Sequence, residues 1–397
     1  MAKNKHRVIR QAYWGALPWE RDGGAVVAYY QYSKLAELRP RWEYYGIPKV
    51  PEELNTKALP FMRYATVKDP KQEIPALMAQ QKIPVLTTFH IAENIEPLID
   101  SIQLVGGKIV QWQTVHWATD RVFSCKRLND LDWFVAPTEF AKRLLSTVGG
   151  VDPAKITVIP HGVDLGKFYP HNQTAFRSNY GISKEQKVIL YAGRLSTWKG
   201  VHNIIPAMRK LIRKYDCIFI IRGGYFNEEG KKLHQIFTLL SRRTPNIIYI
   251  PQWVPPSFME ELTARADIML MPSGHEGFQV NNIEAMACGI PTVTTDVPNI
   301  REVVGNAGIL LQPKEVVGIC DEATPIKVPS SKDIEDALIY LLENPEEATL
   351  IGEVGLARAK ERYDLTKVCK KWIKLYEKLV PPDYDMDDVS AKKLLTL

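Results

Sequence analysis

The sequence predicts an α/β protein made of two Rossmann-like domains, each a doubly wound parallel sheet covered by helices and facing the other across a cleft. Short apolar runs alternate with amphipathic helical patterns throughout the C-terminal half, and less regularly in the N-terminal half. At 397 residues, the chain is also long enough for two domains of ordinary size.

The N-terminal half begins with a basic segment and carries three apolar runs of the length of buried strands, at residues 85–89, 108–114 and 133–136. Helical patterns at residues 95–104 and 138–146 follow two of these runs. Residues 160–170 show no strong period, so we expect a linker there. The first domain is therefore expected to cover residues 1–165.

The C-terminal half predicts a longer series of strands, at residues 187–192, 217–221, 247–250, 267–271 and 292–295. Helical patterns separate them, at residues 200–214, 231–241 and 257–264, with a further helix ending at Gly289. We expect the second domain to cover residues 166–371. The last helical pattern is expected to cross back, so that residues from about 372 to 397 complete the first domain.

Composition excludes several classes of protein. No apolar run reaches the roughly 18 residues that span a bilayer, and no apolar stretch follows the basic N-terminus, so neither a membrane span nor a signal peptide is expected. The 5 cysteines are scattered and form no zinc-binding spacing. We therefore expect a cytoplasmic protein.

The net charge is +6, and the excess lies toward the N-terminal half. Such a bias suits anionic substrates or a peripheral contact with an anionic membrane surface, although an ordinary solvated surface explains it equally well. No Lys/Arg cluster is interleaved with aromatic residues, so no nucleic-acid partner is expected.

The first motif with chemical content is GRLSTWKG at residues 193–200, between a buried strand and a helix. Ligands of open α/β sheets bind at the carboxyl ends of the strands. A guanidinium from Arg194 and an ammonium from Lys199, near a helix N-terminus, suit a diphosphate. Taken alone, the motif also fits a surface turn with two solvated cations.

The second motif is EGFQVNNIE at residues 276–284. Glu276 lies in a loop after the strand at residues 267–271, and Glu284 lies within the next helix. The first amides of that helix favour an anion, whereas the two carboxylates suit sugar hydroxyls. Alone, either glutamate is equally well explained as an ordinary helix residue.

Together the two motifs, about 80 residues apart at one edge of a sheet, change the interpretation. Three further segments support the same resemblance: AMACGIP at 285–291, IPHGVD at 159–164, and AD at 266–267 followed by MPS at 271–273. With these segments, the two motifs resemble the family-4 retaining glycosyltransferases (glycosyl transferases group 1) of the GT-B fold. The similarity covers roughly residues 130–365 well.

The resemblance implies a role for each matching position. Arg194 and Lys199 would bind the donor diphosphate, Glu276 the transferred sugar, and Glu284 the ribose hydroxyls. The remaining donor-site positions are Gly277, Phe278 and Gln279 along the sugar pocket, the Val280 and Asn281 amides at the phosphate, and Val254 near the base. Many family members have glycine where this chain has Gln279, so its side chain is expected either to narrow the pocket or to bind a sugar hydroxyl.

The N-terminal half offers weaker candidates. Gly23 and Gly24 precede a helical pattern and are similar to the family's glycine-rich loop near the donor phosphates, although an ordinary turn fits as well. His116 follows a strand and is similar to the family's acceptor-side histidine, with a structural role as the alternative. His90 is its rival at the end of the preceding strand.

We therefore expect an enzyme, a hexosyltransferase that moves a sugar from a UDP-, GDP- or ADP-sugar to a glycan, lipid-linked or other hydroxyl acceptor. Retention of configuration is implied by the resemblance alone. No metal is expected, because the Asp-x-Asp spacings at 130–132 and 383–385 lie in unsuitable contexts. A membrane-linked or polymeric acceptor is suggested by Trp112, Trp117 and Phe123 near His116, unless these rings fill the core.

Two alternatives stay open. The first is another enzyme on the same fold, a nucleotide-sugar epimerase or a glycan phosphorylase with a pyridoxal cofactor. The second is a non-catalytic protein that only binds a nucleotide sugar. Donor turnover without acceptor, or binding without turnover, would distinguish them.

Overall fold

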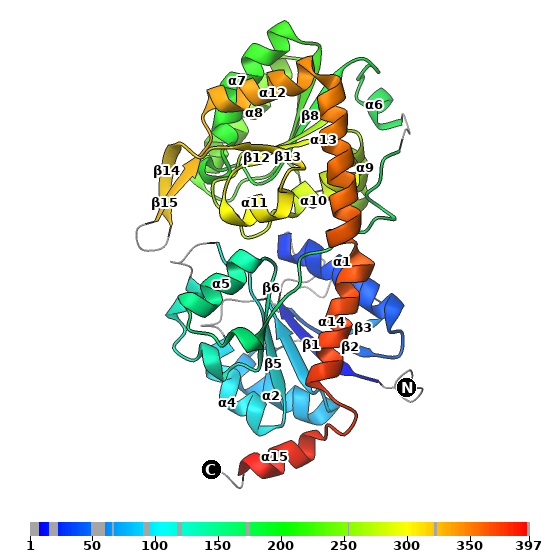
Figure 1. The fold of residues 1–397 in the computed structure, drawn as a ribbon, viewed down its shortest axis with the longest axis vertical. Helices are drawn as coiled ribbons and strands as arrows, with labels where there is room; N and C mark the ends of the chain where they lie inside the picture. The colour runs from blue at the N-terminus through cyan, green and yellow to red at the C-terminus, as the bar shows by residue number, and fades with distance from the viewer. Residues whose placement is uncertain are drawn as a thin grey trace. The chain divides into compact units, whose positions relative to one another are not determined.

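The computed structural model describes residues 8–15, 23–48, 60–65, 67–89, 95–116, 121–171, 175–252, 254–320 and 324–394. The chain divides into two compact units (Figure 1). The first comprises Met1–Gly162 and Leu365–Leu397, and the second comprises Val163–Asp364. The boundaries expected from the sequence were residues 165 and 371.

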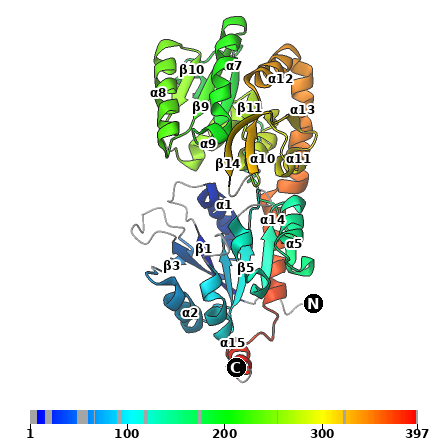
Figure 2. The same ribbon diagram turned by 90° about the vertical axis from the view of Figure 1, so that its left-hand side faces the viewer.

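The first unit is built on a parallel seven-stranded sheet with the order β3-β2-β1-β4-β5-β6-β7. Its strands are β1 (Arg10–Gly15), β2 (Glu43–Pro48), β3 (Met62–Tyr64), β4 (Val85–Thr88), β5 (Lys108–Trp112), β6 (Trp133–Ala136) and β7 (Ile156–Val158). Its longer helices are α1 (Gly23–Leu38), α2 (Pro70–Gln81), α4 (Ile99–Leu104), α5 (Glu139–Thr147), α14 (Leu365–Leu379) and α15 (Met386–Leu394). Figure 2 shows α2 and α14 on opposite sides of the strands, which explains why the central strands are buried on both faces.

Local signals fix where two helices of this unit begin. Asp69 caps α2 by accepting a hydrogen bond from the Lys71 amide (3.1 Å), and Glu73 accepts one from the Asp69 amide (3.0 Å). Thr138 caps α5 in the same way through the Ala141 amide (3.0 Å). Such reciprocal caps satisfy amides that have no partner inside the helix.

The C-terminal segment packs on the first unit. Helix α14 lies beside α1, and the Tyr376 hydroxyl is hydrogen-bonded to the Thr87 hydroxyl in the core (2.8 Å). Trp372 packs edge-on against Trp112, with 5.2 Å between ring centroids. In α15, the Ser390 hydroxyl donates to the Leu104 carbonyl (2.6 Å). These contacts tie the end of the chain to the sheet that its beginning forms.

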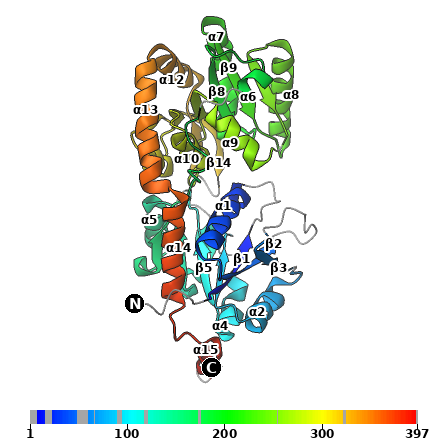
Figure 3. The ribbon, with the colours of Figure 1, turned by 90° about the vertical axis from the view of Figure 1, so that its right-hand side faces the viewer.

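The second unit is built on a parallel six-stranded sheet with the order β10-β9-β8-β11-β12-β13. Its strands are β8 (Lys187–Ala192), β9 (Cys217–Arg222), β10 (Ile247–Ile250), β11 (Ile268–Met271), β12 (Thr292–Thr295) and β13 (Gly308–Leu311). Its helices include α6 (Ala175–Asn179), α7 (Val201–Lys214), α8 (Glu228–Arg243), α9 (Pro256–Ala264), α10 (Val280–Ala287), α11 (Pro298–Val304), α12 (Ser331–Glu343) and α13 (Pro345–Arg358). Figure 3 views this unit with β8 and β9 between α8 and α13.

The strand order of this sheet reverses at one point. From β8 the chain runs outward through β9 to β10, then returns to β11 on the other side of β8 and runs outward to β13. The adjacent pair β8 and β11 is therefore the topological switch point, where open α/β sheets bind their ligands. A hairpin of β14 (Glu315–Cys320) and β15 (Thr324–Val328) follows β13 and packs against the turn Thr197–Lys199 (η6).

Candidate functional site

The two motifs found in the sequence meet at this switch point. The loop at residues 193–200 follows β8, and the loop at residues 272–279 follows β11. Gly200 has a positive φ of 68°, and a side chain there would place its Cβ 2.2 Å from the Pro272 carbonyl oxygen. Only glycine permits this close approach, so Gly200 is what lets the two loops touch.

Lys199 and Glu276 form an ion pair that joins the two loops. Lys199 Nζ lies 2.5 Å from Glu276 Oε1, and the side chains are only 15% and 13% exposed. The Asn299 amide group donates to the Glu276 carbonyl (3.1 Å), which fixes the glutamate's backbone. Both charged groups of this pair are largely removed from water. Separating them therefore costs free energy, unless a charged group of a ligand replaces one of the two partners.

Arg194 is exposed at the mouth of the same loop. Within the described residues, no carboxylate forms an ion pair with its guanidinium. Its backbone is fixed on both sides, because the Gly193 amide donates to the Arg222 carbonyl and the Leu195 amide to the Gly224 carbonyl (2.9 Å each). Arg194 is thus an available cation on an ordered loop.

Gln279 occupies a strained backbone position at the start of α10. Its φ of 61° lies in the left-handed region, which is rare for residues other than glycine. The side-chain oxygen accepts from Asn282 Nδ2 (2.6 Å) and lies 2.9 Å from the Thr294 hydroxyl, and Nε2 lies 3.4 Å from Glu276 Oε1. These contacts offset a backbone strain of about 1–3 kcal/mol. The Gln279 side chain is therefore buried and hydrogen-bonded within the protein.

Glu284 lies inside α10 and is buried (7% exposed). Burial raises the pKa of its carboxyl to about 7; the nearby Glu260 carboxylate adds to this rise, while Arg222 opposes it. Burial in turn lowers the pKa of Arg222, which ends β9. A carboxyl group with a pKa near 7 changes its charge in the physiological pH range. A ligand that donates hydrogen bonds to this carboxyl would stabilise its ionised form.

Most of the other expected donor-site residues lie on the loop after β11 or in the first turn of α10, and Val254 lies between β10 and α9. Gly277 and Phe278 precede α10, and the Phe278 ring is buried against Tyr363, so only its backbone is available to a ligand. Val280 and Asn281 form the first turn of α10, where backbone amides have no partner inside the helix. Val254 is buried just before α9.

The sequence did not single out Arg222 or the aromatic residues around Arg194. Arg222 is the last residue of β9, at the carboxyl ends of the strands where the candidate site lies. A cation at the end of an apolar run is the sequence signal that could have identified it. Gly223 follows it, and a Cβ there would lie 1.8 Å from the Gly193 carbonyl oxygen. The loop after β9 therefore belongs to the candidate site as much as the two motif loops do.

The candidates of the first unit are only partly described. Gly23 and Gly24 open α1, and the segment before them, residues 16–22, lies outside the described residues. His116 is half-buried four residues after β5, whereas His90 and Trp117 lie outside the described residues. Trp112 is 1% exposed and packs on Trp372 and His161, so it fills the core instead of offering a face to a sugar.

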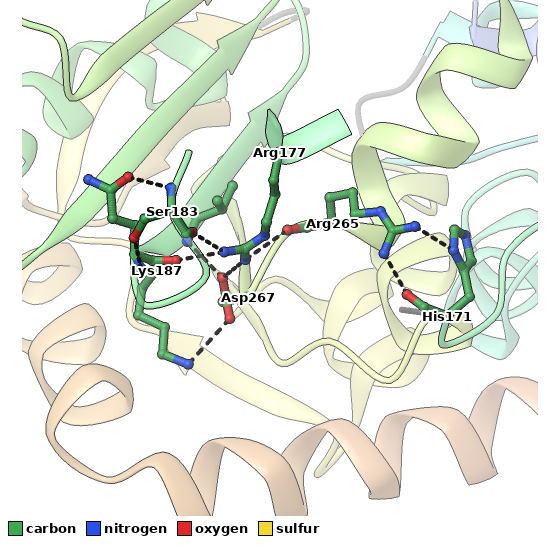
Figure 4. Close-up of polar contacts among 8 residues, drawn as sticks. His171, Arg177, Ser183, Lys187, Arg265 and Asp267 are labelled. Carbon is green, nitrogen blue, oxygen red and sulfur yellow. Dashed lines mark hydrogen bonds and ion pairs between the residues drawn. The ribbon is translucent and has the colours of Figure 1, made fainter. Parts of the chain in front are cut away.

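A cluster of hydrogen bonds and ion pairs stabilises the second sheet at the amino ends of its strands, opposite the candidate site. Asp267 at the start of β11 accepts from Arg177 Nη2 (2.6 Å) and from the Val188 amide (2.8 Å), as Figure 4 shows for the arginine. Nearby, Arg265 donates to the His171 carbonyl (2.6 Å). These groups lie at the amino ends of the strands, so they stabilise the sheet and take no part in the candidate site.

The acidic pair Asp130 and Asp132, which has the spacing of metal-dependent transferases, makes contacts within the protein. Asp130 forms an ion pair with Arg127 (2.7 Å), and Asp132 accepts from the Ile109 amide (2.9 Å). Across the part of the chain that the structure describes, no group of three or more His, Cys, Asp or Glu residues is arranged to hold a metal ion. No helix in that part is long and apolar enough to cross a bilayer.

Two family models match the chain. The model described as glycosyl transferases group 1 matches residues 172–357, and the model described as glycosyltransferase family 4 matches residues 13–167. The two matches fall on the second and first units respectively, and together they cover most of the chain.

Curated relatives are 21–28% identical to the chain over the aligned regions. A D-inositol 3-phosphate glycosyltransferase of Segniliparus rotundus is 28% identical over 57% of this chain, a region spanning 48% of that relative's length. An alpha-maltose-1-phosphate synthase of Mycolicibacterium smegmatis is 21% identical over 75% of this chain and 73% of its own. The chain thus spans about half the length of the first relative.

Solved structures share the fold. A glycosyltransferase of Rickettsia africae superposes with a TM-score of 0.74 over 95% of this chain and all of its own, at 15% identity. HepE of Anabaena, solved in complex with UDP, superposes with a TM-score of 0.71 over 93% of this chain and all of its own, at 16% identity.

Proposed function

Because the chain belongs to the family-4, group 1 glycosyltransferases, we propose that it transfers a sugar from a nucleoside-diphosphate sugar to a hydroxyl acceptor, with retention of configuration. The donor class is UDP-, GDP- or ADP-sugar. The observation that carries this proposal is the Lys199–Glu276 ion pair, which joins the two motif loops at the switch point of the second sheet.

The donor would bind to the second unit through its three loops. Arg194 would contact the diphosphate first, since it is the exposed cation on the loop. Lys199 would then pair with a phosphate oxygen in place of the Glu276 carboxylate. The released carboxylate would accept hydrogen bonds from the hydroxyls of the transferred sugar. Glu284 would accept hydrogen bonds from the ribose hydroxyls, and the first amides of α10 would meet the phosphates.

The chemistry that these groups supply is stabilisation of the leaving group. As the bond from sugar to diphosphate breaks, negative charge grows on the phosphate oxygens. Preorganised cations and helix amides stabilise that charge more in the transition state than in the ground state. Attack by the acceptor on the face from which the diphosphate departs would retain the configuration. No step in this scheme requires a metal ion, and metal-independent transfer is part of the proposal.

For the acceptor we propose a glycan or a lipid-linked compound, with a peripheral contact to an anionic membrane surface. The basic excess of the chain supports this, and His116 is the acceptor-side residue proposed in the first unit. Gly23 and Gly24, at the start of α1, are proposed to lie near the donor phosphates. Trp112 no longer supports it, because this ring lies in the core. A soluble, phosphorylated acceptor is the second candidate, favoured by the names of the two relatives above.

The test is a donor panel followed by a turnover assay. Thermal shifts with UDP-, GDP- and ADP-sugars identify the donor, since a ligand that binds only the folded state raises the Tm. The selected donor is then incubated with and without lipid-linked, glycan and sugar-phosphate acceptors, and products are identified by mass spectrometry. We expect transfer that depends on acceptor. Epimerised donor without acceptor, phosphorolysis of a glycan, or binding without turnover would each replace the proposal with one of its rivals.

A further inference from the structure

Two aromatic rings flank the Arg194 guanidinium. Arg194 Cζ lies 5.8 Å from the centroid of Trp198 and 5.6 Å from that of Phe226, over the face of each ring. Phe226 is 72% exposed. An aromatic ring this exposed gains little from burial, so its contact with the cation is an interaction that stabilises its position.

The two rings come from different loops, and both loops are anchored. The Trp198 ring stacks on His275 (6.0 Å between centroids, 15° between planes), and its carbonyl accepts from the Gly274 amide (2.9 Å). Phe226 directly precedes the cap of α8, where the Asn227 side chain accepts from the Gly230 amide (2.8 Å). The rings therefore meet Arg194 from fixed positions after β8 and after β9.

Among the described residues no carboxylate pairs with the guanidinium, so its N–H groups are available to a ligand. A ring stacks on the face of a guanidinium, whereas its five N–H donors point outward in the plane. An arginine held by its faces can still bind phosphate with two parallel hydrogen bonds. Lys199 Nζ also lies 5.9 Å from the Trp198 centroid, but Lys199 is paired with Glu276, so Arg194 is the cation that remains available to an anion.

We propose that Phe226 and Trp198 are positioning residues, which hold Arg194 between them so that its donor edge meets the diphosphate of the nucleotide sugar. This inference rests on the proposed function. Its consequence is specific: loss of a ring weakens binding of the diphosphate, and leaves binding of the nucleoside portion unchanged.

The experiment measures binding by calorimetry of the full chain to UDP, GDP and ADP, and to uridine, guanosine and adenosine. For the diphosphate that the parent binds best, we expect Phe226→Ala to weaken affinity about three- to tenfold, with affinity for the matching nucleoside unchanged. Phe226→Trp should restore the affinity. In an Arg194→Ala background, Phe226→Ala should have no further effect.

Ile319→Ala is the matched control, because Ile319 is a similarly exposed apolar residue (71%) on the β14–β15 hairpin. Parental diphosphate affinity in Phe226→Ala would overturn the inference. An equal loss of affinity for the nucleoside and the diphosphate would also overturn it, because it indicates that Phe226 stacks on the base. So would an undiminished effect of Phe226→Ala in the Arg194→Ala background. If the parent binds none of the three diphosphates, the proposed function itself fails, and the inference with it.

Discussion

The proposed contact between Glu284 and the ribose predicts that nucleotide binding depends on pH, by an amount that follows from the pKa of the Glu284 carboxyl. This carboxyl is buried, and its pKa is raised to about 7. A carboxylate that accepts hydrogen bonds from two ribose hydroxyls must be ionised, so the donor selects the deprotonated protein. With that pKa, about a tenth of the protein is ionised at pH 6 and about nine tenths at pH 8.

The affinity for a nucleoside diphosphate should therefore rise about tenfold from pH 6 to pH 8, or about 1.4 kcal/mol. The terminal phosphate of the ligand also titrates near pH 6, so the parent must be compared with Glu284→Gln at each pH. The variant carries no ionisable group at this position, and any pH dependence that it retains belongs to the ligand.

Isothermal titration calorimetry in two buffers of different ionisation enthalpy measures both quantities. For the parent at pH 7, we expect a release of about half a proton beyond that of Glu284→Gln, because half of the free protein is still protonated there. Equal pH profiles for parent and variant, or proton uptake on binding, would refute the reasoning.

Further predictions follow from the same contacts. Without ligand, the raised pKa of Glu284 means that the folded protein keeps a proton that the unfolded chain has lost. The free energy of unfolding therefore falls as the pH rises from about 4.5 to 7. In denaturant titrations at pH 8, Glu284→Gln should recover up to about 3 kcal/mol of it. Arg194→Ala should weaken diphosphate binding at least about tenfold with an unchanged Tm, whereas Lys199→Ala should also lower the Tm, because it leaves Glu276 sheltered without its cation; the reverse pattern of Tm values would contradict this. Gln279→Ala should destabilise the protein by about 2 kcal/mol and Gln279→Gly by less, since glycine relieves the positive φ; an Ala variant as stable as the Gly variant would show that the strain is unimportant. EDTA should leave transfer intact, and loss of turnover that Mg²⁺ or Mn²⁺ restores would contradict the metal-independent scheme.

The second unit could be predicted well because its strands are buried on both faces. Strand β8 matches the expected residues 187–192, and β10 and β12 match theirs, since short apolar runs between amphipathic helices have few other structures open to them. The hairpin β14–β15 was missed. Its outward residues Val316 and Ile319 are exposed, so its strands lack the burial pattern that identifies a strand in a sequence.

The first three strands of the first unit were also missed. β1 carries Gln11 and Tyr13 among its buried residues, and such polar side chains interrupt the apolar run that predicts a buried strand. Helix α15 was hidden by the two prolines before it and by its acidic start. In both places, tertiary packing decided the structure where the local pattern was weak.

That the two motif loops lie together could be predicted from the sequence, but the contacts between them could not. The two motifs were expected at one edge of a sheet, which follows from strand order alone. The Lys199–Glu276 pair and the contact of the Gln279 amide with Thr294 depend on side-chain directions, and Gln279 itself has a left-handed backbone that the sequence pattern does not indicate. Similarly, the rings around Arg194 come from loops whose conformations no periodic pattern encodes.

The central claim is that a nucleoside-diphosphate sugar binds to the second unit through the loops after β8 and β11. Its most direct test is a calorimetric titration of the full chain, and of the Arg194→Ala/Lys199→Ala double variant, with UDP-, GDP- and ADP-sugars at pH 8. The account predicts saturable binding of one of these donors at a single site in the parent, and at least about a hundredfold weaker binding in the double variant. Parental affinity in the double variant, or no binding of any donor to the parent, would contradict it.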